Sequence, residues 1–348
     1  MSDRTRPPLP FDADFDGHRL HLHPEAVSTW LREGQTRCPL YVELELASAC
    51  PHRCSFCGVS HLVDGGRGNL DPAQARRLFA DLAAGGTRAL LVSGHGEPLL
   101  HPEAAPLVAE ASRQMSVALT TNGVRLDQAS LPLIDHLAWL RVSVNGGDAA
   151  TYARVHGCAP EAFEHVLAQL EAAVARKRDL GLGVTIGVQM VVVPDNAASL
   201  PDLARRVRAI GVDYLSAKPY SRHPINPAAP PEPDVDWREL ADRLEGLSTP
   251  TFALRVRRGT AARIRAPRPY AACLAAPFMA FVDAAGEVWA CLVHAGDARF
   301  SLGRLEDAPI GDLWASARAR RVMDFVAREV DVSRCRSGCR LDAANAYL

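Results

Sequence analysis

Three of the nine cysteines in this chain lie within the eight residues CPHRCSFC, as Cys50, Cys54 and Cys57. The spacing C-x3-C-x2-C puts three thiols on one short loop, and thiolates are soft ligands that select zinc, copper(I) or iron–sulfur clusters. A structural zinc site closes a tetrahedron with four ligands, usually as paired C-x2-C units. Three thiolates suit three corners of an iron–sulfur cubane and leave the fourth iron open to a small molecule. Zinc remains the alternative at this point.

Charge and composition bound the environment in which these thiols work. The chain has 348 residues, with 39 Lys plus Arg against 40 Asp plus Glu, so its formal charge is -1. This balance gives no electrostatic reason to bind nucleic acid or an anionic membrane. No apolar run approaches the roughly 18 residues of a membrane span, and the start MSDRTRPPLP lacks the apolar stretch of a secretory signal. We therefore expect a cytoplasmic protein, in which disulfides are rare.

Strand patterns alternate with helix patterns up to residue 222. The helix after the first strand has clear boundary signals, with Asp71 as its N-cap, Pro72 at its first position and Gly85 and Gly86 at its end. The expected strands cover 40–46, 88–94, 116–123, 139–147, 183–193 and 212–220, and the expected helices cover 71–84, 127–137, 160–179 and 199–210, with another from about 103. Six β-α units with continuous apolar strands predict a parallel sheet covered by helices, which closes into part of a barrel. Active residues of such barrels lie at the carboxyl ends of the strands.

A proline-rich run, HPINPAAPPEPD over 223–234, predicts a stiff linker. Beyond it we expect a helix over 236–247, two strands within 277–291 and a helix over 310–329. The predicted organisation is an N-terminal extension (1–39), a partial barrel (40–222), a linker with a helix (223–265) and a small α+β domain (266–348). The last domain carries four further cysteines, Cys273, Cys291, Cys335 and Cys339.

The cysteine loop and the segments after later strands together resemble the radical S-adenosylmethionine (SAM) enzymes. In that family C-x3-C-x2-C follows the first strand of a partial (βα)6 barrel and holds a [4Fe–4S] cluster, whose open iron chelates the amino and carboxylate groups of SAM. The resemblance implies that Cys50, Cys54 and Cys57 are the cluster ligands. It also implies that Phe56, which matches the family's usual aromatic residue, packs near the cofactor.

Other barrel motifs match the family in the order of the strands. SGHGEP (93–98) resembles the Gly-Gly-Glu-Pro motif that meets the amino group of SAM, although His95 stands at a position where glycine is usual. TTNG (120–123) follows the third strand, and further matches lie on the fourth strand, shortly after it and on the fifth strand. The residues that the resemblance assigns to SAM binding are Gly96, Glu97, Pro98, Asn122, Ser143, Asn145, Arg154 and Gln189.

The resemblance implies cofactor-borne chemistry. A one-electron donor such as flavodoxin or ferredoxin reduces the cluster, which passes the electron into the sulfonium of SAM. The C5′–S bond then breaks, and the resulting 5′-deoxyadenosyl radical abstracts hydrogen from an unactivated C–H bond. The protein supplies positioning and a dry cavity.

The spacing of the four C-terminal cysteines resembles the twitch module, a shortened relative of the SPASM extension of radical SAM enzymes. That module binds one auxiliary [4Fe–4S] cluster, which four thiolates ligate completely. Such a cluster can accept one electron from a substrate radical and so permit a net oxidation, such as alcohol to ketone. Four cysteines also satisfy zinc, and this alternative stays open.

Three residues are candidates for work on the substrate. Cys158, in RVHGCAP, could return a hydrogen atom to a substrate radical and so epimerise it, or it is simply a small residue in a tight turn. Lys218 and Tyr220 end the sixth strand and are candidates for binding a polar or anionic substrate. The expected reaction is dehydrogenation or epimerisation of a small polar metabolite, such as a sugar, aminocyclitol or nucleoside. The alternatives are a peptide-maturing radical SAM enzyme and, more remotely, a zinc-binding scaffold without catalysis.

Overall fold

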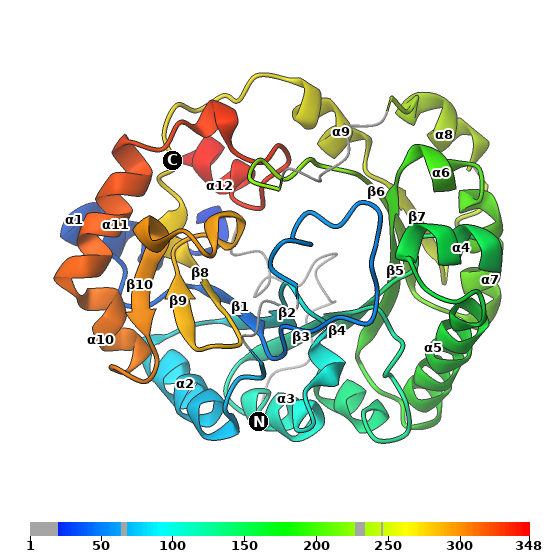
Figure 1. The fold of residues 1–348 in the computed structure, drawn as a ribbon, viewed down its shortest axis with the longest axis horizontal. Coiled ribbons are helices and arrows are strands. Elements are labelled where there is room, and N and C mark those ends of the chain that lie inside the picture. Colours follow the sequence, from blue (N-terminus) through cyan, green and yellow to red (C-terminus); the bar gives the residue numbers. More distant parts are fainter. Residues whose placement is uncertain (1–19, 64–67, 227–233, 245) are drawn as a thin grey trace.

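The fold is a curved sheet with helices along its outer side (Figure 1). The structure is a computed structural model that describes residues 20–63, 68–226, 234–244 and 246–348. Its strands are β1 (Tyr41–Glu45), β2 (Ala89–Ser93), β3 (Ser116–Thr121), β4 (Trp139–Ser143), β5 (Thr185–Val192), β6 (Tyr214–Pro219), β7 (Ala253–Val256), β8 (Met279–Val282), β9 (Glu287–Trp289) and β10 (Ser301–Arg304). Its α-helices are α1 (Pro24–Glu33), α2 (Pro72–Gly85), α3 (Ala104–Ala111), α4 (Ala149–His156), α5 (Glu161–Asp179), α6 (Pro194–Ala197), α7 (Leu200–Ile210), α8 (Trp237–Arg243), α9 (Arg258–Arg265), α10 (Ile310–Ala315), α11 (Ala317–Arg328) and α12 (Asp342–Tyr347).

The described strands form one sheet in the order β10-β9-β8-β1-β2-β3-β4-β5-β6-β7. Neighbours from β8 through β7 pair in parallel, whereas β9 and β10 join antiparallel. The predicted parallel partial barrel is therefore confirmed, and it is longer than its six expected strands. β7 lies within the stretch assigned to a linker and helix. The expected C-terminal hairpin, β8 and β9, also joins the barrel, with Tyr41 paired to Met279. This pairing covers the edge of β1, which would otherwise expose unpaired backbone groups.

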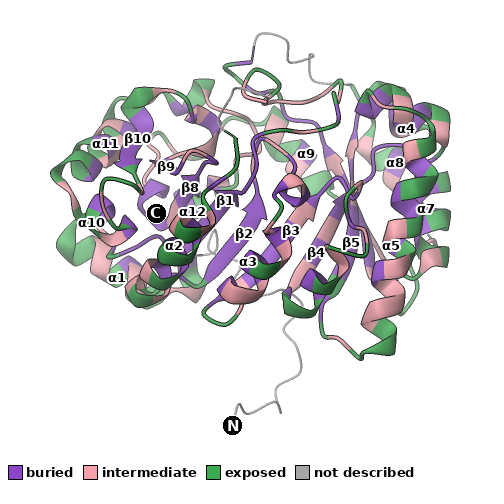
Figure 2. Cartoon of the chain, turned by 60° about the horizontal axis from the view of Figure 1, so that its bottom comes forward, coloured by how far each residue is buried: buried purple, intermediate pink, exposed green. Residues whose placement is uncertain are grey.

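Side chains alternate across the strands of this sheet. On β1, Val42 and Leu44 point outward into the main hydrophobic core, which includes Leu78 and Phe79 of α2. Tyr41, on the opposite face of β1, belongs to a separate cluster formed by the inner side of the sheet. Figure 2 shows the strands buried and the solvent faces of the helices exposed. The buried carboxylates of Glu43 and Glu45 share the inner face of β1 with Tyr41.

Helix ends follow the predicted boundary signals where a capping side chain is present. The backbone N–H of Gln74 donates to the Asp71 carboxylate over 2.8 Å at the start of α2, and Gly86 ends the helix in the left-handed conformation. The expected helix over 310–329 is instead two helices, because the Ser316 side chain caps α11 by accepting from the N–H of Ala319. The segment expected as a helix over 127–137 forms a 3-10 helix at Leu131–His136. Helix α4 was not expected.

The N-terminal segment packs against the C-terminal part of the chain. Leu20 and Val27 share a hydrophobic cluster with Phe278 and Leu341. Thr36 donates to the carbonyl oxygen of Pro277 over 2.6 Å. Residues 227–233 of the expected linker lie outside the described residues. No helix in the described part of the chain has both the length and the apolarity to cross a membrane.

Candidate active site

The cysteine loop follows β1 and brings three thiols together. Burial, followed by the neighbouring Cys57 and Cys50 groups, raises the pKa of the Cys54 thiol. Burial likewise raises the pKa of Cys50 to about 11, with a further contribution from Cys57. Three mutually interacting thiols of this kind ionise together only when a cation offsets their charge. This donor set therefore fits an iron–sulfur cluster held by three cysteines.

The end of helix α4 holds this loop in place. The N–H groups of Arg53 and Ser55 donate to the carbonyl oxygens of His156 and Val155, each over 2.9 Å. Gly157 then turns the chain away with φ of 60°, and a Cβ at this position would lie 2.4 Å from the carbonyl oxygen of Arg53. The sequence HGC therefore allows a close contact between two loops that are about a hundred residues apart.

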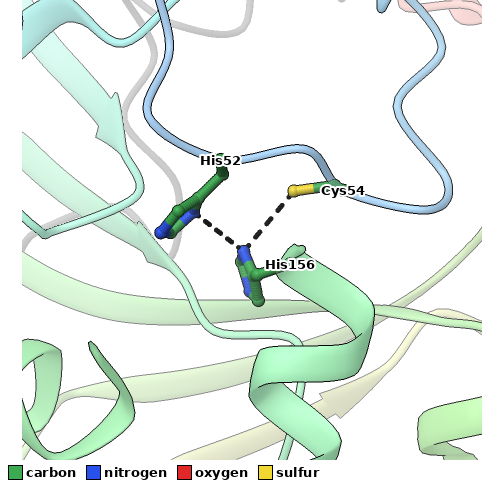
Figure 3. A group of neighbouring side chains, drawn as sticks. All are labelled: His52, Cys54 and His156. Atoms are coloured by element: carbon green, nitrogen blue, oxygen red, sulfur yellow. Dashed lines mark hydrogen bonds between the residues drawn. The ribbon is translucent and has the colours of Figure 1, made fainter. Parts of the chain in front are cut away.

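The roles of two histidines were missed by the sequence analysis: His52 lies within the cysteine loop and His156 at the end of α4, and their rings face each other (Figure 3). His156 Nδ1 lies 3.1 Å from His52 Nδ1 and 3.5 Å from the Cys54 sulfur. The backbone N–H of Asn145 donates to His156 Nε2 over 3.0 Å, so this nitrogen is an acceptor and the ring proton sits on Nδ1. Burial lowers the pKa of His156 to about 3, which keeps the ring neutral. His156 Nδ1 is thus an N–H donor that faces both His52 Nδ1 and the Cys54 sulfur, and the protonated nitrogen is not available to bind a metal ion.

The Gly-Glu-Pro segment after β2 packs tightly against the cysteine loop. A Cβ on Gly96 would lie 2.1 Å from the carbonyl oxygen of Ala47, so a larger residue would push the two loops apart. The buried Glu97 carboxylate accepts from the hydroxyl of Thr121 (2.6 Å) and from the N–H groups of Asn122 (2.7 Å) and Leu99 (3.1 Å). Glu97 therefore joins the loops after β2 and β3.

The other residues predicted to bind SAM lie just after β3, at the end of β4 or just after it, within β5, and on α4. Asn122 directs its amide nitrogen toward the Cys50 sulfur at 3.9 Å. The Asn145 side chain is engaged within the protein, because its oxygen accepts from the N–H of Val191 over 2.6 Å. Ser143 pairs in register with Gln189. Arg154 is exposed and donates to the carbonyl oxygen of Asp195.

The four C-terminal cysteines form a second group. The pKa of Cys291 is raised by burial and then by the nearby Cys339 and Cys273, and Cys335 is influenced in turn by Cys339. Polar groups surround their sulfurs: the Asn345 amide lies 3.5 Å from Cys273, and His294 Nε2 lies 3.8 Å from Cys335. The Arg268 guanidinium fixes the loop by donating to the carbonyl oxygens of Cys335, Arg336 and Val332. This donor set fits a fully ligated cluster.

The candidate substrate residues lie between these two groups. Buried Tyr220 packs with Phe56, Val155 and Val193. Lys218 is half-buried, and the positive charge of Arg336 contributes, after burial, to lowering its pKa. The same Arg336 lowers the pKa of both Cys57 and Cys339, against the opposing effect of burial, and therefore lies near both thiol groups.

Cys158 packs against the main hydrophobic core and lies close enough to Cys54 to raise the pKa of the Cys54 thiol.

Cys38 is buried, and the Thr87 hydroxyl faces its sulfur at 3.4 Å. A Cβ on Gly85 would lie 2.8 Å from the Cys38 sulfur, which indicates a packing role for that cysteine.

The three thiols of the cysteine loop and the four C-terminal thiols fit the class of iron–sulfur enzymes, and the family models agree. The family model described as the radical SAM superfamily matches residues 44–207, and that described as an iron–sulfur cluster-binding domain (SPASM) matches residues 273–340. The chain belongs to the radical SAM superfamily and carries a C-terminal SPASM domain, as the sequence motifs predicted. Its cofactors are accordingly a [4Fe–4S] cluster, SAM and an auxiliary iron–sulfur cluster.

Curated relatives and solved structures extend this comparison. The chain is 27% identical over 224 residues to the PqqA peptide cyclase of a Methylobacterium species, covering 60% of this chain and 56% of that protein. It is 24% identical over 306 residues to the AdoMet-dependent heme synthase of Methanosarcina barkeri, covering 82% and 85%. Streptococcus suis SuiB bound to its precursor peptide SuiA superposes with a TM-score of 0.66 and 14% identity, covering 91% and 73%, which shows a shared fold. The chain thus spans little more than half the length of the peptide cyclase.

Proposed function

We propose that Cys50, Cys54 and Cys57 hold the SAM-binding cluster and that the enzyme abstracts hydrogen from a small polar metabolite. The carrying observation is the group of three interacting thiols at the carboxyl end of β1. When bound, the reduced cluster and SAM supply a 5′-deoxyadenosyl radical that can abstract hydrogen from a C–H bond. A flavodoxin or ferredoxin is the proposed source of the electron.

The residues around the cysteine loop connect the neighbouring loops and form an apolar wall beside the cysteines. Glu97 joins the two loops that would flank SAM, and Gly96 lets one of them approach the cysteine loop. Phe56, Tyr220, Val155 and Val193 form an apolar wall beside the cysteines. We propose that Gly96, Glu97, Pro98, Asn122, Ser143, Asn145, Arg154 and Gln189 surround SAM. Of these, Glu97 and Asn145 act as positioning residues, because their side chains are bonded within the protein.

We propose that Cys273, Cys291, Cys335 and Cys339 hold the auxiliary cluster. Four thiolates leave it no open iron, so it is suited to receive an electron rather than to bind a ligand. Dehydrogenation fits this arrangement, since the substrate radical must lose a second electron. Epimerisation instead needs a hydrogen donor, for which Cys158 is the candidate.

A second candidate is a peptide-modifying enzyme. The observation that favours it is the similarity to a relative named PqqA peptide cyclase, over 60% of this chain. The two candidates differ in the size of the substrate that must reach the inner face of the sheet. A deuterated metabolite and a deuterated peptide therefore distinguish them.

Deuterium transfer tests the proposal. The anaerobically reconstituted enzyme is incubated with SAM, reductant and deuterated candidate metabolites, and 5′-deoxyadenosine is analysed by mass spectrometry. Incorporation of deuterium from a metabolite supports the small-molecule reaction, whereas incorporation only from a peptide establishes the second candidate. The variant Cys158→Ala distinguishes epimerisation from dehydrogenation. If the enzyme is an epimerase, the variant still cleaves SAM but forms no product. If it is a dehydrogenase, the variant still forms product.

A further inference from the structure

The inner face of the sheet collects basic side chains from β4, β6 and the segment after β7. Arg141 on β4 donates from Nε to the Tyr214 hydroxyl on β6 over 3.1 Å, and its guanidinium lies 4.5 Å above the Trp139 ring. Arg257, just after β7, donates from Nε to the Ser216 hydroxyl over 3.1 Å. Lys218 is two residues beyond Ser216 and shares its face. Three cations from three parts of the barrel therefore meet on one surface.

A glycine on the intervening strand makes room for this arrangement. Gly187 on β5 pairs with Arg141 on one side and with Tyr214 on the other. A Cβ at Gly187 would lie 2.1 Å from the Tyr214 ring, so the ring lies directly over the glycine. The Tyr214 hydroxyl reaches Arg141 across this gap. Glycine at position 187 therefore leaves the space that the Tyr214 ring needs to reach the Arg141 guanidinium.

These cations lack acidic partners in the described part of the chain. Arg340 forms an ion pair with Glu43 at 2.9 Å, but Arg141, Lys218 and Arg257 have no carboxylate within ion-pair distance among the described residues. Burial lowers the pKa of Lys218 well below its usual value, and the charges of Arg336, Arg340, Arg257 and Arg141 lower it further. Like charges gathered without anions destabilise a fold unless a ligand offsets them.

The negative charge of the cysteine thiolates can offset only some of these positive side chains. Arg336 acts on the thiols of Cys57 and Cys339, so its charge serves the two thiol groups. Arg141 is partly buried and Arg257 is exposed, so solvent screens Arg257, and a bound anion would offset the charges of both.

We propose that the substrate carries an oxyanion group, a carboxylate or a phosphate, bound by Arg141, Lys218 and Arg257 on the inner face of β4, β6 and the segment after β7. The inference rests on the proposed function and narrows its substrate class. Guanidinium groups suit both oxyanions, because their paired N–H donors match two oxygens. An acidic or phosphorylated sugar or a nucleotide fits this surface, whereas the ammonium group of an aminocyclitol is repelled by it.

The test is anion binding to the holoenzyme. The anaerobically reconstituted protein is saturated with SAM, so that the carboxylate of SAM cannot produce the signal, and is titrated by calorimetry with inorganic phosphate or succinate at low ionic strength. We expect saturable binding that weakens roughly tenfold or more in Arg141→Gln and Arg257→Gln. Arg141→Lys keeps the charge but loses the paired N–H donors, so its affinity should lie between those of the wild type and Arg141→Gln. Arg113→Gln, an exposed arginine on the outside, matches the wild type.

The two probes identify the oxyanion, because the preferred probe shares its chemistry with the substrate. Equal affinity in the wild type and both glutamine variants would overturn the inference, as would the absence of saturable binding in the wild type. Dithionite-driven SAM cleavage is measured on the same samples, and the control variant Arg113→Gln should leave it unchanged. A wild-type holoenzyme that binds anions but does not cleave SAM refutes the proposed function and leaves the anion site standing.

Discussion

Replacing Glu97 by alanine removes the shared acceptor that joins the loops after β2 and β3. Two buried backbone N–H groups, of Leu99 and Asn122, and the Thr121 hydroxyl lose their partner. Each buried donor left unpaired costs about 1–3 kcal/mol, and the hydroxyl can turn to another acceptor, so we expect a loss of about 4 kcal/mol. Glu97→Gln keeps one acceptor oxygen but presents an N–H₂ group at the other position, and should lose about 2 kcal/mol.

Anaerobic urea unfolding of the holoenzyme measures both losses, and calorimetry measures SAM affinity. Because Asn122 also faces the Cys50 sulfur, we expect SAM binding to weaken in the same order as stability. Glu110→Gln is the matched control, since Glu110 pairs with Arg76 at the surface and should lose less than about 1 kcal/mol. The reasoning is refuted if Glu97→Ala unfolds within about 0.5 kcal/mol of the wild type, the usual range of neutral surface changes.

Three further changes test separate parts of the structure. Gly187→Ala should displace the Tyr214 ring and cost about 1–3 kcal/mol in urea unfolding, whereas Gly183→Ala, with open space around it, should cost little. Replacing Cys335 and Cys339 together by alanine should halve the iron content and leave some SAM cleavage; unchanged iron would remove the auxiliary-cluster assignment. Burial and the nearby Arg336 lower the pKa of His223 to about 3, so only the unfolded chain gains this proton as the pH falls below 6.5. The wild type should therefore lose about 2 kcal/mol relative to His223→Gln between pH 7.5 and 5, and parallel pH profiles would contradict this.

Local patterns carried most of the correct predictions. The C-x3-C-x2-C spacing, the Asp71 cap and the apolar strands are each legible within a short window of sequence. The same short windows do not predict the break at Ser316. The apolar pattern continues through this residue, but its side chain caps the second helix, α11. These windows also miss β7, whose short ALRV run lies beyond helix α8 and pairs with β6.

Contacts between distant segments account for what could not be predicted. Nothing near His156 indicates that it faces Cys54, because the approach depends on the α4 backbone docking on the cysteine loop. The pairing of β8 with β1 joins segments more than two hundred residues apart. Arg141 and Arg257 are unremarkable in sequence, and only the barrel brings them to the same face as Lys218.

The central claim is that the three-cysteine loop holds a cluster that binds and cleaves SAM. Its most direct test is electron paramagnetic resonance of the anaerobically reconstituted, dithionite-reduced protein with and without SAM, beside iron analysis. The account predicts about eight iron atoms per chain and a spectrum that changes when SAM is added, with both the SAM response and SAM cleavage lost in Cys57→Ala. Bound zinc in place of iron, or undiminished SAM cleavage by Cys57→Ala, would contradict it.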